Sequence, residues 1–444
     1  MMASPTRRPA GRRRILLTFS DQAVSSASNF VTGVAVARLA GVARFGDYML
    51  TIMVWLIVVG VHRAVITEPI IVTGGQGGGD RRATLAHGLT AELLLAAAAS
   101  AVVATSGLGI SLLGADLGRT MLALAPWFAP LLVQDYWRAM AFQQRRPGLA
   151  LVNDLTFAGV QLAAIVFFAL HGWRTVGFML AAWGLGATAG ALLGLLWFPV
   201  VGGLHASVSM LRRMWPLSRW MLADFATGFG SDQAYLAFAA VLLSRADYGG
   251  YRAAFSLMGP TVVILLAGGN LGLPEASRRA DPEQPAALRV YARRLTTGIL
   301  CCVGLYCAAV AVGSGRLLGA LYGPAFSRYG VLATLSALQY VLLATVFGQL
   351  IALKAAGRMR LLWRVRIGVF IASLSSMTLL VRWLGTPGAG WAGVATAALY
   401  LTAIQSVYRR ELGHRPAAAL SESGGVPRRA AVSWSAPVRP EIDT

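Results

Sequence analysis

Charged side chains are scarce in this sequence. Only 13% of its 444 residues are Asp, Glu, Lys or Arg, whereas about a quarter of a typical soluble domain is charged. Hydrophobic residues make up 56% of the chain, and the mean hydropathy is +0.62. This composition excludes an ordinary soluble domain and predicts an all-α polytopic membrane protein.

Lysine and cysteine are almost absent. Lys354 is the single lysine among 39 basic residues, and the strong preference for arginine is typical of a high-GC bacterial genome. The three cysteines, Cys301, Cys302 and Cys307, all fall in one apolar run. Their spacing provides neither a disulfide framework nor a set of metal ligands. We therefore expect no cofactor and no metal site.

Acidic residues are also few, with 18 against 39 basic ones and a net charge of +21. Such an excess could attract nucleic acid, but its distribution indicates membrane topology instead. With the N-terminus placed in the cytoplasm, cytoplasmic segments and the span ends beside them hold 29 basic residues. The opposite loops with their span ends hold 9, while Arg63 lies deeper within a span. Cytoplasmic loops of membrane proteins carry such an excess. We expect no nucleic-acid partner, contact with anionic membrane lipids, and a bacterial inner-membrane protein with both termini cytoplasmic.

Long apolar runs divide the chain into membrane spans, each of which needs about 20 residues to cross the hydrocarbon layer. The expected spans are 15–37, 48–72, 84–106, 118–141, 151–170, 174–198, 217–243, 250–273, 295–312, 329–352, 367–384 and 389–408. They form two six-helix lobes, 15–199 and 217–408, joined by a cytoplasmic linker at 200–216. A basic segment, 1–14, precedes them, and a tail, 409–444, which we expect to be disordered, follows.

The first and seventh spans carry similar polar stripes, 203 residues apart. The stripes consist of Asp21, Ser25, Ser28 and Thr32 in the first span and Asp224, Gly228, Ser231 and Tyr235 in the seventh. Each set is spaced i, i+4, i+7, i+11 and so lies on one helix face. Because polar groups that face lipid are costly, each stripe should face a protein interface or a water-filled cavity. Two matching stripes, one in each lobe, predict two lobes that close around a shared cavity.

The repeat continues beyond the stripes. A shift of 203 places Phe45-Gly46-Asp47-Tyr48 on Tyr248-Gly249-Gly250-Tyr251, in both cases at an outer loop. A verbatim Ser-Asp-Gln-Ala match at Ser20 and Ser231 favours a shift of 211, but it leaves too few residues before Tyr251 for an equivalent helix and loop. Six helices separate the copies, so we predict lobes related by a pseudo-two-fold axis along the membrane normal.

Ionisable residues within the spans gather in the first lobe, in its cytoplasmic half. They are Asp21, His62, Arg63, Glu68, Glu92, Asp135, Arg138 and Asp154. Away from the span ends, the spans of the second lobe hold only Asp224 and Asp232. Because intramembrane charges mark functional sites, we expect the first lobe to carry most of a charged headgroup site.

Arg63 is the sharpest candidate, because its guanidinium could hold a diphosphate through two charge-assisted hydrogen bonds. The alternative is a structural pair with Asp21, Glu68 or Glu92. Asp21 could in turn be the counter-ion of Arg63, a proton or cation site, or a solvated carboxylate. His62 could couple the cycle to protons.

Three further expectations concern residues in or near the spans. Asp135 and Arg138, three residues apart, should form a local ion pair. Kinks are expected at five prolines, Pro69, Pro126, Pro130, Pro260 and Pro274. The proposed substrate contacts are Arg63, Asp21, Glu92, Ser25, Ser28, Asn29, Asp224 and Ser231.

Two segments carry a resemblance to a known family. The opening helix reads Ser-Asp-Gln-Ala-Val-Ser-Ser-Ala-Ser-Asn-Phe from Ser20, and the eighth reads Tyr-Arg-Ala-Ala-Phe-Ser-Leu-Met-Gly-Pro from Tyr251. Over residues 15–408 the chain resembles the polysaccharide-transporter branch of the multidrug/oligosaccharidyl-lipid/polysaccharide exporter superfamily. The resemblance implies two six-helix bundles that alternate access to a central cavity. The implied substrate is a polyprenyl-diphosphate-linked oligosaccharide, and glycan-assembly enzymes are candidate partners.

The resemblance leaves the substrate open. Peptidoglycan-precursor flippases of the superfamily use cavity arginines for the diphosphate and usually have fourteen helices, whereas this chain has twelve expected spans and few intramembrane arginines. An O-antigen-like, capsular or exopolysaccharide substrate is therefore favoured. The alternative is a cation-coupled multidrug or toxin antiporter that uses Asp21 or Glu92. Enzymes such as a polymerase or a glycan ligase usually need a large outer loop, and the outer loops here are short, so we expect a transporter and not an enzyme.

Overall fold

The computed structural model describes residues 9–74, 80–144, 146–198, 202–280 and 285–412, without the side chains of 9–19, 22–23, 74, 227–234, 270 and 285. Every regular element in the described chain is a helix. The first lobe contains α1 (Pro9–Ala40), α2 (Val42–His62), η1 (Arg63–Thr67), α3 (Glu68–Gly74), α4 (Arg81–Leu112), α5 (Asp116–Leu124), η2 (Ala125–Trp127), α6 (Phe128–Gln143), α7 (Pro147–Leu170) and α8 (Val176–Trp197). The second contains α9 (Leu204–Leu242), α10 (Arg245–Ser256), α11 (Gly259–Ser277), α12 (Pro285–Tyr322), η3 (Pro324–Tyr329), α13 (Gly330–Thr345), α14 (Phe347–Ala355), α15 (Met359–Leu384) and α16 (Thr386–Leu412).

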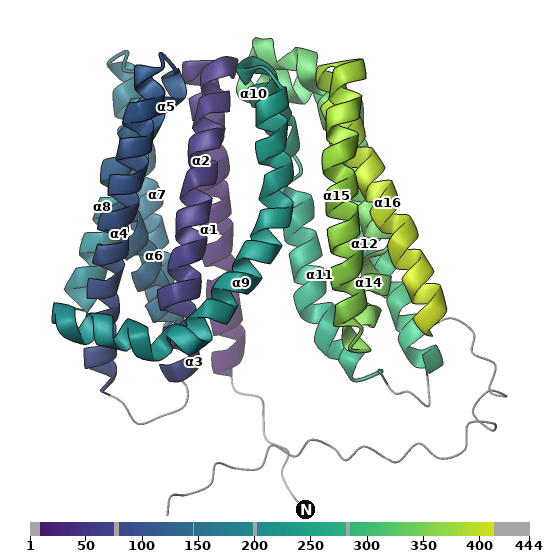
Figure 1. Ribbon diagram of the computed structural model, residues 1–444, viewed down its shortest axis with the longest axis horizontal. Coiled ribbons are helices and arrows are strands. Elements are labelled where there is room, and N and C mark those ends of the chain that lie inside the picture. The colour runs from purple at the N-terminus through teal and green to yellow at the C-terminus, as the bar shows by residue number, and fades with distance from the viewer. Residues whose placement is uncertain (1–8, 75–79, 145, 199–201, 281–284, 413–444) are drawn as a thin grey trace, which may run out of the picture.

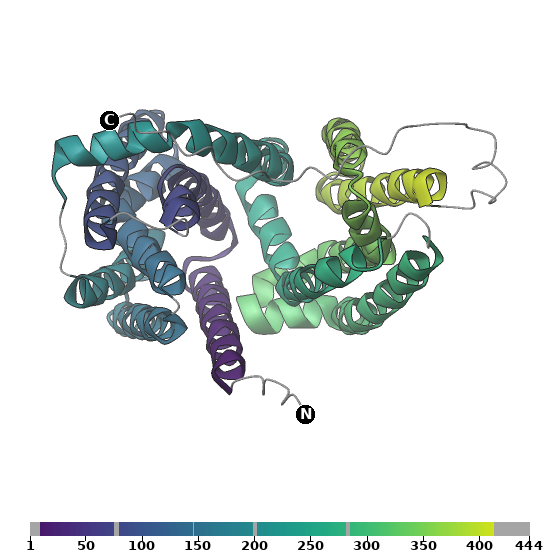
Figure 2. The same ribbon diagram turned by 90° about the horizontal axis from the view of Figure 1, so that it is seen from below.

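The helices stand side by side in two groups that α9 connects (Figures 1 and 2). Each expected span lies on one straight or bent helical segment, so the all-helical, two-lobe architecture is confirmed. In the described chain, seven segments are long and apolar enough to cross a membrane, and the bent pair α10 and α11 makes an eighth. We call the end at which α1 begins and α16 ends the lower end, and the opposite end the upper end (Figure 1).

Breaks within the helices follow local chemistry. Pro126 lies in the 3₁₀ turn η2, and Pro260 starts α11 just after its bend of 46° from α10. Proline removes a backbone donor, so a helix commonly restarts at it. Pro69 follows the π-helical turn η1, and Pro130 lies in the first turn of α6, whereas Pro274 lies within the continuous helix α11. The kinks expected at Pro126 and Pro260 are therefore confirmed.

The two copies of the repeat meet at the upper end. A Cβ on Gly46 would lie 2.3 Å from the carbonyl oxygen of Arg245, and a Cβ on Gly249 would lie 2.2 Å from that of Val42. Under the 203-residue shift, Gly46 corresponds to Gly249 and Val42 to Arg245. These two contacts are thus the same contact seen from each copy, as a two-fold relation requires. The geometry confirms the 203-residue register and the pseudo-two-fold arrangement, and only glycine allows the helices to approach so closely.

Further contacts close the upper end between the lobes. The Nε of Arg38 on α1 donates to the carbonyl oxygen of Leu321 on α12 at 2.6 Å. Phe45 packs against Tyr322 and Phe326, with ring centroids 5.9 Å apart in both pairs. Arg245 reaches back across the boundary, with its Nη1 3.5 Å from Oδ1 of the buried Asp47. Aromatic, carbonyl and ionic contacts therefore hold the lobes together at this end.

The first part of α9 covers the lower end of the first lobe (Figure 1). Residues 204–216, which we expected to be a linker, are helical here. Met210 and Met214 are buried in a first-lobe cluster with Leu85 and Leu89. The expected basic and tail segments fall mainly outside the described residues.

Candidate functional site

A π-helical turn positions the first two ionisable side chains. The second span changes from α-helix to π-helix at Arg63 and returns to α-helix at Glu68. Such turns are rare and occur frequently at functional sites. Here His62 is fully buried, while the Arg63 side chain remains 47% exposed. The turn thus places neighbouring residues in different environments.

His62 lies between two carboxylates from other helices. Its Nδ1 contacts the Glu92 carboxylate on α4, and its Nε2 lies 3.0 Å from Oδ2 of Asp135 on α6. The Thr67 hydroxyl lies 3.1 Å from the same Nε2. An imidazole ring can donate to a carboxylate from both nitrogens only when it is doubly protonated. The arrangement therefore favours an imidazolium that joins α2, α4 and α6.

Arg63 pairs with Asp135 and with none of the three acids expected for it. Its Nε donates to Oδ2 of Asp135 at 2.9 Å, and an Nη donates to Oδ1 at 2.6 Å. This is the bidentate geometry that makes guanidinium–carboxylate pairs strong and directional. Two cations, His62 and Arg63, thus face two anions, Glu92 and Asp135, so the charges of this group balance.

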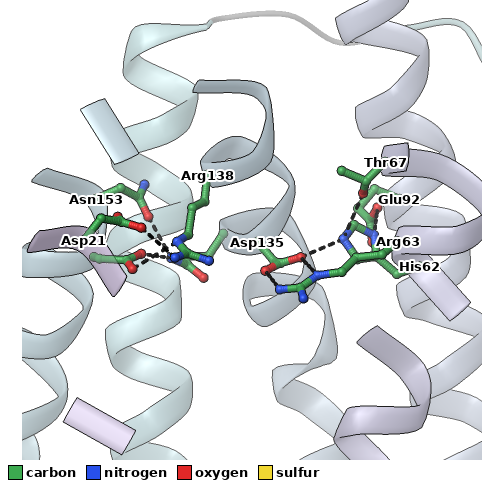
Figure 3. Close-up of polar contacts among 10 residues, drawn as sticks. Asp21, His62, Arg63, Thr67, Glu92, Asp135, Arg138 and Asn153 are labelled. Carbon is green, nitrogen blue, oxygen red and sulfur yellow. Dashed lines mark hydrogen bonds and ion pairs between the residues drawn. The ribbon is translucent and has the colours of Figure 1, made fainter. Parts of the chain in front are cut away.

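Arg138 forms a second group instead of the expected local pair with Asp135. Its Nη2 donates to Oδ2 of Asp21 on α1 at 2.6 Å, and its Nε lies 3.0 Å from Oδ2 of Asp154 on α7. Figure 3 shows Asp135 and Arg138 pointing in opposite directions from α6. Asp21 and Asp154 are buried, and a buried carboxylate is costly unless a cation or hydrogen bonds compensate its charge. Asp21 is therefore the partner of Arg138, neither the counter-ion of Arg63 nor a solvated carboxylate.

Amide side chains complete the interior of the first lobe. Ser28 donates to Oε1 of Gln161 on α7 at 3.2 Å, and Gln161 in turn donates to the hydroxyl of Thr32 at 2.9 Å. Asn153 accepts a hydrogen bond from Gln134 at 2.9 Å. The buried members of the first polar stripe therefore face α6 and α7 within their own lobe. The expectation that this stripe faces a cavity shared between the lobes is wrong, because polar side chains on the neighbouring helices satisfy it.

The remaining candidates are less constrained. Ser25 is half-buried and Asn29 is exposed on α1, while Glu92 is fully buried against His62. Asp224 is exposed on α9. The side chain of Ser231 lies outside the described residues. Contact of these residues with a substrate stays a prediction.

The second lobe contains a cavity that the sequence analysis did not identify. Its volume is about 1150 Å³, and α9, α10, α11, α13, α14, α15 and α16 contribute to its wall. Asp224 and Tyr235, the two ends of the second polar stripe, both line it. Two cations, Lys354 and Arg366, line it as well. Sequence reasoning treated these two as topology signals, because each lies just outside an apolar run.

The two cations of the cavity lie toward the lower end of its lobe. Arg366 lies two turns into α15, which begins at the lower end, and Lys354 is in the last turn of α14. At the upper end, the cross-lobe contacts of Gly46, Arg38 and Phe45 bring the lobes together. The molecule is therefore closed at the upper end and hollow toward the lower end. In the described residues, no group of three or more His, Cys, Asp or Glu side chains is placed to hold a metal ion.

Known structures share this fold. No family model and no curated protein sequence matches the chain. An inward-facing multidrug resistance MATE family transporter of the MOP superfamily superposes with a TM-score of 0.67 at 12% identity, over 92% of this chain and 100% of that one. The lipid II flippase MurJ, in an inward closed conformation, also gives 0.67, at 10% identity over 89% of this chain and 87% of that one.

The similar structures also differ from one another in conformation. A MATE family transporter in an outward-facing conformation gives a TM-score of 0.53 over 93% of this chain. The fold of the chain thus superposes better on the inward-facing structure than on this outward-facing one. The chain has the helical fold of MOP-superfamily transporters.

Proposed function

We propose that this protein is a flippase that moves a polyprenyl-diphosphate-linked oligosaccharide across the bacterial cytoplasmic membrane by alternating access. The MATE and MurJ fold supports a transporter. The resemblance of the Ser20 and Tyr251 segments to polysaccharide transporters supports the substrate class. The basic excess of the segments expected in the cytoplasm supports a cytoplasmic lower end. Substrate then enters from the leaflet on which lipid-linked sugars are assembled.

The observation that carries the proposal is the pairing of the buried acids in the first lobe. A cation-coupled antiporter needs a carboxylate that can exchange ions or protons with water. Asp21 is bound by Arg138, Glu92 by His62, and Asp135 by both His62 and Arg63. A carboxylate already paired with a fixed cation has little to gain from a mobile one. The first lobe therefore fits a structural scaffold better than a cation site.

The antiporter remains the second candidate because of two oxygen atoms. Oδ1 of Asp21 and Oε1 of Glu92 are buried and have no hydrogen-bond partner in the described chain. Buried carboxylate oxygens without partners are costly, and a bound cation could satisfy them. Such an antiporter acts on drugs or toxins and not on glycan precursors.

Deletion of the gene in its own host separates the two functions. We expect lipid-linked oligosaccharide to accumulate on the cytoplasmic leaflet and surface polysaccharide to fall, with unchanged sensitivity to cationic drugs. The measurements are protection of the lipid-linked sugar from an external glycosidase, surface glycan content, and growth inhibition. Normal surface glycan together with increased drug sensitivity would establish the antiporter and exclude the flippase.

A further inference from the structure

The second-lobe cavity is lined by side chains of both charges and by neutral polar groups. Lys354 and Arg366 supply two positive charges, and Asp224 supplies one negative charge. Gln339, Tyr340 and Tyr400 add neutral hydrogen-bonding groups. An anion with several oxygen atoms could meet both cations at once, since arginine and lysine are the usual partners of phosphate groups in proteins.

Apolar side chains form the rest of the wall. Leu343, Leu350, Phe370 and Trp363 all line the cavity, and Trp363 is 56% exposed. Ligand cavities usually measure about 300–1000 Å³, so a space of about 1150 Å³ accommodates a large amphiphile. A charged rim beside apolar and aromatic walls suits a molecule with an anionic headgroup and a hydrocarbon chain.

The charge cluster of the first lobe is a poor site for an anion. Every arginine in that cluster is committed to a carboxylate, Arg63 to Asp135 and Arg138 to Asp21 and Asp154. An incoming phosphate must compete with these acids and leave at least one of them buried without a cation. Leaving a buried carboxylate without its cation is strongly unfavourable.

We propose that the cavity of the second lobe binds the diphosphate-bearing end of the substrate, with Lys354 and Arg366 as its anion contacts. This inference rests on the proposed function, which names the substrate class. The phenols and the Gln339 amide face the adjoining polar part of the ligand. The apolar wall, including Trp363, accommodates the first units of the polyprenyl chain. Both cations lie toward the lower end of the lobe, which an amphiphile from the cytoplasmic leaflet reaches first.

Binding of a short analogue to the purified full-length chain tests the site. Isothermal titration in detergent compares farnesyl diphosphate with farnesol and with inorganic diphosphate. We expect farnesyl diphosphate to bind at least tenfold more tightly than either, because only it meets both the cations and the apolar wall. Equal binding of farnesol would overturn the anion site, and equal binding of inorganic diphosphate would overturn the amphiphile site.

Substitutions then locate the binding. We expect Arg366→Gln and Lys354→Gln each to weaken farnesyl diphosphate binding by about tenfold or more, and Arg366→Lys to weaken it less. The matched control is Arg364→Gln, which removes the same charge from the same helix at an exposed residue that does not line the cavity. Its affinity should stay within about twofold of that of the unmodified chain. Unchanged affinity in Arg366→Gln and Lys354→Gln, with normal melting temperatures, would place the anion elsewhere.

The failure of this inference is distinguishable from that of the proposed function. If both variants bind and flip the native substrate normally, the flippase stands and the cavity assignment is wrong. If the unmodified chain binds no prenyl diphosphate and its deletion changes drug sensitivity alone, the proposed function is wrong, and the assignment falls with it.

Discussion

The two lobes repeat one backbone plan, but their charged side chains lie in different surroundings. In the first lobe, ionisable residues lie in mid-helix and form ion pairs with one another, as Arg138 does with Asp21 and Asp154. In the second, Lys354 and Arg366 lie near helix ends and line a cavity. A charge in the middle of a bundle must have a partner, because leaving it unpaired is too costly. A charge near a helix end can extend into a water-filled space.

The comparison also shows why a count of charges within spans was misleading. It counted charges that pair with one another inside the first lobe and omitted Lys354 and Arg366, which line the second-lobe cavity. The largest number of intramembrane charges therefore marks the lobe in which they form ion pairs. Four predictions test this contrast, in order of decreasing effect.

The largest effect is expected from Arg138→Met. It leaves Asp21 and Asp154 buried without their cation, and breaking a buried pair in this way typically costs about 3–5 kcal/mol. We expect a much lower yield and melting temperature in detergent. The triple variant Arg138→Met, Asp21→Asn, Asp154→Asn should recover most of the loss, because it removes the buried charges together. A melting temperature for Arg138→Met equal to that of the unmodified chain would contradict the pairing.

The next effect concerns Asp135, which holds both His62 and Arg63. We expect Asp135→Asn to cost about 1–3 kcal/mol, since a charged donor loses its anion; the half-exposed Arg63 keeps the cost below that of Arg138→Met. A double-mutant cycle with Arg63→Gln should show strong coupling, so that the double variant is little worse than either single one. Additive losses in thermal stability would mean that the two residues act independently.

A smaller effect is expected at the closed upper end. Gly46→Ala places a methyl group against the carbonyl of Arg245, and overpacking of this kind costs about 1–3 kcal/mol. The helices α2 and α10 can relieve the clash by separating, so the upper end should open more often. We expect faster labelling of a cysteine at Met49 by a water-soluble maleimide, in a chain lacking Cys301, Cys302 and Cys307.

The control for that experiment is Gly33→Ala, since a Cβ on Gly33 meets nothing within 4 Å. It should label at the rate of the parent chain. Equal labelling of the Gly46 and Gly33 variants would show that the glycine contact does not hold the upper end closed.

The smallest effect is a dependence on pH at Asp116, whose Oδ2 lies 3.9 Å from Nη1 of Arg245 across the boundary between the lobes. A hydrogen bond from Arg44 lowers the pKa of the Asp116 carboxyl below its ordinary value of 3.8. A lowered pKa means that the stabilisation is fully present above the ordinary value and is lost as the pH falls through the folded one. Because the thiolate is the reacting form of cysteine, the labelling rate is divided by that of free cysteine at the same pH. We expect this ratio for the cysteine at Met49 to be constant from about pH 5 to 8 and to rise slightly below about pH 4. Asp116→Asn should abolish that rise, and a change near neutral pH would assign the dependence to another group.

Much of the fold follows from the sequence alone. Apolar length predicted the helical segments, and the 203-residue repeat predicted which residues meet at the pseudo-two-fold axis, as Gly46 and Gly249 do. Pro126 and Pro260 marked breaks, because proline cannot continue the hydrogen-bond ladder of a helix. These features depend on local chemistry and on the order of the elements.

The ion-pair partners within the candidate site could not be predicted from the sequence. The three-residue spacing of Asp135 and Arg138 permits an ion pair, but the choice depends on which helices pack on each side of α6. Arg138 points toward the buried acids on α1 and α7. Asp135 points toward His62 and Arg63, on the opposite side of α6 (Figure 3). The cavity was missed because the expected span boundary at residue 367 excluded Arg366. Spacing in one helix carries no information about either feature.

The most direct test compares Arg366→Gln with Arg364→Gln in cells that depend on this protein. At matched membrane abundance, the measurement is the fraction of lipid-linked oligosaccharide left on the cytoplasmic leaflet. We predict strong accumulation with Arg366→Gln and none with Arg364→Gln, because only the first removes a cation from the cavity wall. Equal, normal distribution of the lipid in both strains would contradict a headgroup site in the second lobe.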